Sequence, residues 1–461
     1  MDTIYDHLVL VSLDTLRSDA ISASPSKLWP LKYPNLRAPR TRILDEFATK
    51  AAFFPNCVSV APYTSTSHAT IITGQWPLHH GVREFFNRRL RSNTLFRAAQ
   101  RSGRRTLLKT DFPLILGPTL GFDDAVDDFI IEDDAAFLAA LRRSQRSVSL
   151  VHFAGIHIPY GFHNLRYGGR AYRAKVEAFE NEFGPAADLP KDQLVETYRD
   201  KEDLFYLLRY KRIIQELWQS GQAARIFGLY LEGIEHFLAT RFEPFITRLY
   251  ECLVDTRWLM VVFGDHGEEY DSESFGHFNS VAEGVLRVPL MFLGSDVLPG
   301  TYRKRVRTLD ILATLSELMP DLHIGRASLD GESLVRSVRE GDEPTGNRTS
   351  FAQAYVADTA AFIRFQQRLV ARGEKRGVLP HVLFKEAVYE GDFKLTRQHY
   401  DYGSYLGSPQ PIPTITRLER FDKEGVPETT ASPSVSATME SLLDKYGALW
   451  QARRRASRTD T

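Results

Sequence analysis

Four polar residues whose side chains can bind metals or act as nucleophiles stand at the ends of apolar segments. Asp14 follows one apolar run, Asp265 and His266 follow another, and Thr64 precedes a run that ends at Gly74. Two carboxylates, an imidazole and a hydroxyl form a donor set that suits a divalent cation. A bound cation would lower the pKa of the threonine hydroxyl and make a weak nucleophile usable. The residue types therefore indicate a metal centre with Thr64 as the attacking group.

Thr64 also opens a predicted helix, in the hydroxyl-rich stretch 64–67. Free backbone N–H groups and the helix dipole at such a position favour a phosphate or sulfate group. Serine and threonine hydroxyls also cap helices, and capping is the alternative role of the whole stretch. The other metal-ligand candidates favour the catalytic role for Thr64.

The segments that carry these residues predict the fold. Apolar runs typical of buried strands alternate with segments of helical spacing; the strands are expected at 7–12, 53–60, 104–109, 147–155 and 258–264, and the helices at 40–52, 92–103 and 133–144. Such alternation predicts an α/β fold with a mostly parallel central sheet sandwiched by helices. Ligands of open α/β sheets bind outside the carboxyl ends of the strands. Asp14 and Asp265 are expected at that edge.

Two later segments have residue patterns that differ from this alternation of strands and helices. Aromatic and charged residues at helical spacing fill about 165–250, which predicts a helical insertion beside the site. After about residue 345 the pattern changes to hairpin strands, followed by a terminal helix. We therefore predict a catalytic α/β domain at 1–345 and a smaller C-terminal antiparallel α+β region at 346–461.

The amino-acid composition limits the kinds of molecule that the protein is expected to bind. Lysine plus arginine number 58 and aspartate plus glutamate also number 58, so the net charge gives neither nucleic acid nor an anionic membrane a reason to bind. Two cysteines are too few for a disulfide scaffold. The strand pattern that begins at His7 leaves no room for a secretory signal, and no stretch is as apolar as a membrane span, so we expect a cytoplasmic protein. The oligomeric state is not indicated.

Five segments together resemble the sulfatase branch of the alkaline phosphatase superfamily. They are VSLDTLRSD, APYTSTSHATIITGQWPLHHGV, HIPY, FGDHGEEYDSESFGHFNSVAEGVLRVPLMF and the C-terminal YEGDFKL with LERFDKEGVPETT. The likeness runs from about residue 7 to about 430 and is weakest between about 165 and 250. It implies that Asp14, Asp265 and His266 bind the metal. It further implies that His157 and His277 contact the anion of a small anionic ester.

The sequence departs from the sulfatase pattern at the nucleophile. Sulfatases make formylglycine from the first residue of Cys-x-Pro-x-Arg, whereas this chain has Thr64 there, with Thr66 for the proline and His68 for the arginine. Threonine cannot become formylglycine. A threonine nucleophile is similar to that of phosphoethanolamine transferases, lipoteichoic acid synthases and nucleotide phosphodiesterases. That resemblance implies a phosphothreonine intermediate.

The same resemblance guides the choice of metal and anion contacts. Thr15 replaces a further aspartate of many sulfatases, and His266 is a nitrogen ligand, so one zinc or manganese ion is expected rather than calcium. A second ion is an alternative, although Gly155 stands where the family often has aspartate. Lys109 and Arg83 are candidate substrate contacts, with a solvated surface as the alternative for each.

We therefore expect a metal-dependent hydrolase of phosphate or phosphonate esters. Thr64 would attack the ester, and His157 or His277 would protonate the leaving alkoxide. Three alternatives stay open: a sulfatase that lacks formylglycine, a phosphoryl-group transferase, and a catalytically silent binding protein with the same fold.

Overall fold

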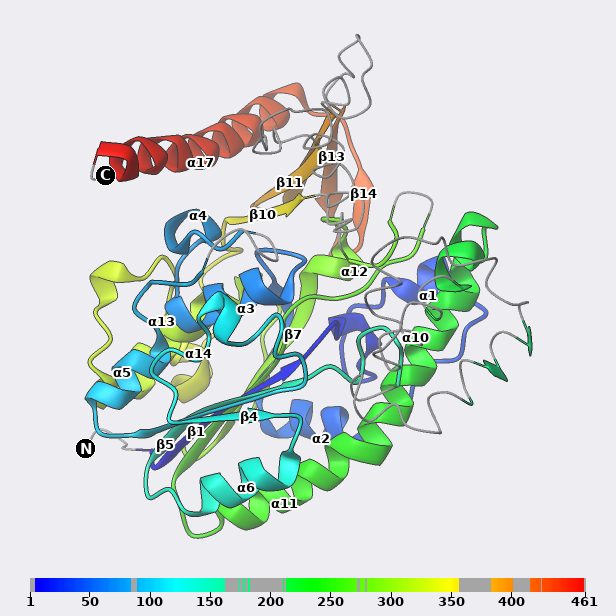
Figure 1. Ribbon diagram of the computed structural model, residues 1–461. Coiled ribbons are helices and arrows are strands. Elements are labelled where there is room, and N and C mark those ends of the chain that lie inside the picture. Colours follow the sequence, from blue (N-terminus) through cyan, green and yellow to red (C-terminus); the bar gives the residue numbers. More distant parts are fainter. Residues whose placement is uncertain are drawn as a thin grey trace, which may run out of the picture.

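The structure of the protein is a computed structural model (Figure 1). The residues that it describes are 5–83, 89–161, 174, 177–178, 181–182, 210, 213–271, 274–277, 280–355, 383–400, 415–423 and 425–459. Much of the helical insertion expected at about 165–250 therefore lies outside the described residues.

The central element is a nine-stranded sheet in the order β4-β3-β5-β1-β6-β7-β2-β8, with β9 also paired to β2. Its strands are β1 (His7–Leu13), β2 (Ala52–Val58), β3 (Arg105–Thr110), β4 (Asp128–Ile131), β5 (Ser147–Phe153), β6 (Trp258–Gly264), β7 (Arg287–Gly294), β8 (Gly300–Thr301) and β9 (Val306–Arg307). β1 pairs in parallel with both β5 and β6, whereas β7 is antiparallel to β6 and β2. The prediction of a mostly parallel sheet is confirmed.

Helices cover both faces of this sheet (Figure 1). One face packs against α2 (Arg42–Lys50), α6 (Asp134–Arg142), α10 (Ala223–Phe237) and α11 (Glu243–Leu253), with the π-helical turn η3 (Leu238–Phe242) between the last two. The other face packs against α3 (Thr64–Thr73), α5 (Leu95–Arg101), α13 (Asp310–Leu318) and α14 (Val335–Glu340). β1 shows why its sequence is a continuous apolar run. Val9 and Val11 enter the first core, and Leu8 and Leu10 enter the second.

Short helical segments join these elements. They are η1 (Ser18–Ala20), α1 (Trp29–Lys32), α4 (Pro77–His80), η2 (Pro118–Leu120), α12 (Glu283–Leu286), η4 (Pro320–Leu322) and η5 (Arg326–Ser328). Within the described part of the chain, no helix combines the length and the apolar character needed to cross a membrane.

A second, antiparallel sheet follows, in the order β10-β11-β12-β13-β14. Its strands are β10 (Ser350–Tyr355), β11 (Leu383–Glu390), β12 (Phe393–Tyr400), β13 (Ile415–Phe421) and β14 (Pro427–Thr429). The terminal helix α17 (Pro433–Thr459), at the red end of the chain in Figure 1, follows this sheet, and its Met439 and Leu443 pack on one face of the sheet. The opposite face packs on α12. The expected hairpins and terminal helix are present.

Candidate active site

The strand register brings three chain segments to one point at the edge of the central sheet. Leu13, the last residue of β1, pairs with Phe153 of β5 on one side and with Gly264 of β6 on the other. The three strands therefore end together. Asp14, whose backbone N–H donates to the Phe153 carbonyl at 3.0 Å, lies beside Asp265 at this edge.

Helix α3 brings Thr64 to the same place. Thr64 is its first residue, so the N–H groups of the first turn have no acceptor within the helix. The helix is buried along its length, and the hydroxyl of Ser67 donates to the Asp265 carbonyl at 2.7 Å. It ends at Gly74, whose φ of 62° lies in the left-handed region that glycine tolerates. Thr64 is thus held rigidly against the segment after β6.

The four predicted residues form one buried cluster. His266 Nε2 lies 3.3 Å from Thr64 Oγ1. The same nitrogen lies 3.6 Å from Asp14 Oδ1 and 3.6 Å from Asp265 Oδ2. All four side chains are nearly inaccessible to solvent. Residues far apart in the sequence therefore present three oxygens to one imidazole nitrogen.

Hydrogen bonds assign the tautomer of His266. Its Nδ1 lies 3.1 Å from the Gly267 carbonyl, which can only accept, so Nδ1 carries the proton. In the neutral ring, the lone pair on Nε2 then faces Thr64 and the two carboxylates. Asp14, Asp265 and His266 each place a ligand atom within 4.8 Å of the others.

Two buried oxygens of this cluster lack a partner. Asp14 Oδ1 and Asp265 Oδ2 have no hydrogen-bond donor among the described residues. Burial, followed by the neighbouring Asp14 carboxylate, raises the pKa of Asp265. Adjacent buried carboxylates repel each other unless a cation lies between them. The site thus fits a divalent ion, which Asp14, Asp265, His266 and Thr64 would hold.

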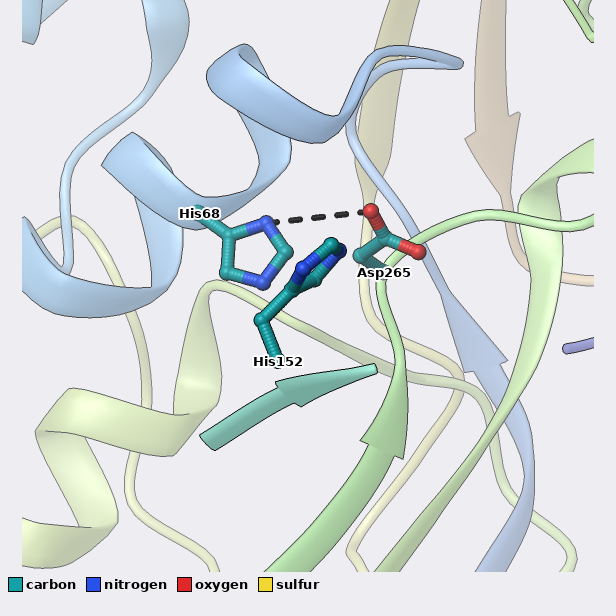
Figure 2. A group of neighbouring side chains, drawn as sticks. All are labelled: His68, His152 and Asp265. Carbon is teal, nitrogen blue, oxygen red and sulfur yellow. Dashed lines mark ion pairs between the residues drawn. The ribbon is translucent and has the colours of Figure 1, made fainter. Parts of the chain in front are cut away.

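A second group, His68, His152 and Asp265, lies beside this cluster (Figure 2). His68 Nδ1 is 2.7 Å from the Thr64 carbonyl, to which it can only donate, and its Nε2 is 2.9 Å from Ser12 Oγ. His152 Nε2 is 3.2 Å from Asp14 Oδ2. Burial lowers the pKa of both histidines to about 4.

These bonds make His68 and His152 supports of the site. With its proton on Nδ1, His68 does not offer that nitrogen to an ion; it fixes the first turn of the helix that carries Thr64. Because a carboxylate oxygen accepts, the Nε2–H of His152 donates to Asp14 Oδ2 and orients that carboxylate. The sequence motifs do not predict this role for either residue, although the four-residue spacing of Thr64 and His68 on a helix is a detectable signal.

His157 and His277 lie next to the cluster, as expected for anion contacts. The ring of His277 is 4.4 Å from that of His266 and 5.2 Å from that of His157, measured between centroids. His157 Nδ1 is 2.7 Å from the Ile158 carbonyl, and His277 Nδ1 is 3.0 Å from a carboxylate oxygen of Glu268. Both rings are therefore oriented through Nδ1.

The two candidate cationic contacts differ from the rest. Lys109 Nζ lies 2.5 Å from Asp111 Oδ1 and 3.0 Å from Asp134 Oδ1, fully buried in an ion network. In this structure its charge is directed at carboxylates of the protein. Arg83 follows α4 and borders residues 84–88, which lie outside the described part, so its substrate contact stays a prediction.

The sheet, the covering helices and the site at the strand ends define the alkaline phosphatase fold. Solved structures share it: a 2-O GAG sulfatase is 16% identical with a TM-score of 0.59, covering 98% of this chain and 94% of its own. The phosphonate monoester hydrolase of Agrobacterium radiobacter is 16% identical with a TM-score of 0.58, covering 97% of this chain and 96% of its own. Another neighbour, solved in complex with its substrate D-glucosamine-2-N,6-O-disulfate, is 14% identical with a TM-score of 0.59, covering 97% and 98%.

The family follows from the sequence model that matches residues 8–269. The chain belongs to the type I phosphodiesterase / nucleotide pyrophosphatase family. A search of curated proteins found no match.

Proposed function

We propose that the protein is a metal-dependent hydrolase of phosphate or phosphonate esters that uses Thr64 as its nucleophile. The observation that carries this proposal is the 3.3 Å contact between Thr64 Oγ1 and His266 Nε2, beside two buried carboxylate oxygens without donors. Family membership supports an ester hydrolase, and a solved phosphonate monoester hydrolase shares the fold. A bound divalent ion would supply a Lewis acid that activates the threonine hydroxyl and neutralises anionic charge.

The protein's own residues divide the remaining work. Thr64 loses its hydroxyl proton to water and attacks the central atom of the ester; as the phosphothreonine bond forms, the bond to the leaving alkoxide breaks. The N–H groups of the first turn of α3 face the negative oxygens. His157 and His277 donate to those oxygens, and one of them gives its proton to the leaving alkoxide. Water then attacks the phosphothreonine, which releases the anion and restores Thr64.

Sulfate esters are the second candidate substrate class, because two of the solved neighbours are a sulfatase and a protein bound to a sulfated glucosamine. Sulfate and phosphate esters have the same tetrahedral shape and differ mainly in charge. Rates on nitrophenyl phosphate, bis-nitrophenyl phosphate, a phenylphosphonate ester and nitrophenyl sulfate would separate the classes. We expect the phosphorus esters to be hydrolysed faster. A preference for the sulfate would overturn the assignment of substrate class.

The nucleophile is tested by Thr64→Ala, with Thr64→Ser as the matched control that keeps a hydroxyl. The alanine variant is expected to lose about a thousandfold or more in kcat. Its bound metal, measured by elemental analysis, should stay close to stoichiometric because Asp14, Asp265 and His266 are unchanged. Rapid acid quench should trap phosphate on the wild-type and serine proteins alone. Full activity of the alanine variant would refute the role of Thr64.

A further inference from the structure

A cavity of about 660 Å³ lies away from the catalytic cluster, where the second sheet meets the central one. Its wall includes parts of the β2 strand, the segment before β9, the end of β13 and the loop that follows. Six cationic side chains line it: Arg287, Arg303, Lys304, Arg305, Arg420 and Lys423. Three carboxylates also line it: Asp392, Asp422 and Glu428. No ion pair links these carboxylates to the cations of the wall among the described residues.

Among the described residues, the buried cations beside this cavity outnumber the carboxylates that form ion pairs with them. Arg305 is 2% exposed, Arg287 is 4% exposed and Lys394, just behind the wall, is 1% exposed. The buried carboxylate that pairs with them is Glu283, which lies 2.6 Å from Arg287 and 2.8 Å from Lys394. Among the described residues these cations form ion pairs with Glu283 alone, through Arg287 and Lys394; Asp392 attracts Arg305 without pairing with it, and a buried charge that is only partly compensated is unfavourable.

Arg305 is the one of these three cations that forms no ion pair with a carboxylate among the described residues. Its Nη1 donates to the Gly391 carbonyl at 2.9 Å, and no carboxylate pairs with it in the described part of the chain. Its guanidinium stacks over the rings of Tyr389, at 4.9 Å, and Phe421, at 5.5 Å. Stacking of this kind offsets part of the lost hydration but supplies no negative charge.

Arg287 is also incompletely satisfied, although it pairs with Glu283. Its guanidinium lies 5.4 Å from the same Phe421 ring, so two guanidinium groups contact one aromatic side chain. Arg287 Nε is buried and has no acceptor among the described residues. Burial lowers the pKa of Arg305; Tyr389, Glu283 and Asp392 oppose this lowering in part, and the like charge of Arg287 adds to it. Both observations describe a cationic site that an anion would stabilise.

We propose that this cavity is a second oxyanion site, which binds a phosphate or sulfate group through Arg305 and Arg287. Guanidinium groups match tetrahedral oxyanions because two parallel N–H donors reach two oxygens. The anion is either free phosphate or sulfate, or a second anionic group on a larger ester. The site shares no side chain with the catalytic cluster, so it stands independently of the assigned reaction.

The test measures inorganic phosphate binding by calorimetry on the full-length, metal-loaded protein at constant ionic strength. The wild type should bind phosphate at two sites. Arg305→Met should weaken one of them by about tenfold or more, because it removes a charged donor and keeps the apolar stem. Lys50→Met, which removes an exposed charge at the end of α2 outside the cavity, is the matched control and should change binding little. Equal binding by the wild type and Arg305→Met would overturn the proposal.

Thermal unfolding provides a readout of a different kind. Without phosphate, Arg305→Met should be at least as stable as the wild type, since a repelling buried charge is gone. With saturating phosphate the wild type should gain more in Tm than the variant. If the variant does not fold, wild-type crystals soaked in selenate replace it. Anomalous density between Arg287 and Arg305 would support the site, and density at the catalytic cluster alone would contradict it.

Kinetics distinguish the two sources of the anion. If the cavity takes a second group of the substrate, Arg305→Met should raise KM for an ester with two phosphate or sulfate groups and leave KM for nitrophenyl phosphate unchanged. If it takes the free anion, both KM values should match those of the wild type while the loss of phosphate binding persists.

Discussion

Two buried polar clusters near the edge of the central sheet differ in how their charges are matched. In the first, Lys109 and Arg241 face Asp111 and Asp134, with Arg241 at 2.7 Å from Asp111 and 2.8 Å from Asp134. In the second, Asp14 and Asp265 face His266, and each keeps one oxygen without a donor among the described residues.

The contrast separates a structural role of the first cluster from the metal-binding role that we propose for the second. A network with two cations and two carboxylates is complete in itself and holds β3, α6 and η3 together. A pair of carboxylates without a cation is complete only with a bound ion. The cavity at Arg305 has the opposite arrangement, because cations there lack paired carboxylates. For this reason we propose an anion as its ligand.

The largest expected effect is on stability and concerns the first cluster, in which two cations face two carboxylates; we call it the matched network. Asp111→Asn leaves Lys109 and Arg241 with a single carboxylate between them, so the free energy of unfolding should fall by about 3–5 kcal/mol. Asp124→Asn, which breaks the exposed pair with Arg97, is the control and should cost less than about 1 kcal/mol. Denaturant titrations measure both. Equal small losses would show that the buried network is not a structural element.

The second prediction concerns the unmatched cluster, in which Asp14 and Asp265 lie side by side without a cation. Asp265→Asn keeps an oxygen that accepts from the backbone N–H groups of Thr15 and His266, but it replaces the oxygen without a donor by an amide nitrogen. Metal affinity should fall by about a hundredfold or more, and the metal-free protein should become more stable because a repelling charge is removed. Calorimetric titration with zinc or manganese and thermal unfolding in chelator provide the readouts. A less stable metal-free variant would contradict this interpretation.

A smaller effect is expected at the support of Asp14. His152→Leu removes the N–H that orients Asp14 Oδ2, so metal affinity should fall by about 10- to 100-fold. His152→Gln can restore a donor near the same position and should recover part of that loss. If the leucine and glutamine variants bind metal equally, the hydrogen bond does not position Asp14.

The smallest expected effect is the pH dependence of the matched network. Burial by itself raises the pKa of Asp111, but Lys109 and Arg241 outweigh burial and lower it from 3.8 to about 2. A depressed pKa in the folded state stabilises the protein above the unfolded value, and that stability is lost as pH falls from about 4 to about 2. Unfolding free energies of the wild type should therefore lose about 2 kcal/mol more than those of Asp111→Asn across this range. Parallel pH profiles would show that Asp111 is not paired as described.

Much of the fold could be predicted from local patterns. The apolar runs placed β1, β5 and β6, and helical spacing placed α2, α5 and α6, because a sheet buried on both faces requires continuous apolar strands. The antiparallel direction of β7 could not be predicted, since a buried strand has the same composition in either direction. The pairing of β2 with β7, β8 and β9 also depends on contacts distant in the sequence.

For the site, the sequence by itself determined the candidate residues: two aspartates, a threonine and a histidine, each at the end of a strand or the start of a helix. Their chemical roles remain predictions. Only the tertiary structure decided how their charges are balanced. Lys109 as an anion contact and Lys109 as a partner of Asp111 are indistinguishable in the sequence. Arg305 is likewise one of many arginines until its burial is known. The physical reason is that charge compensation depends on distance and burial in three dimensions, which residue order alone does not specify.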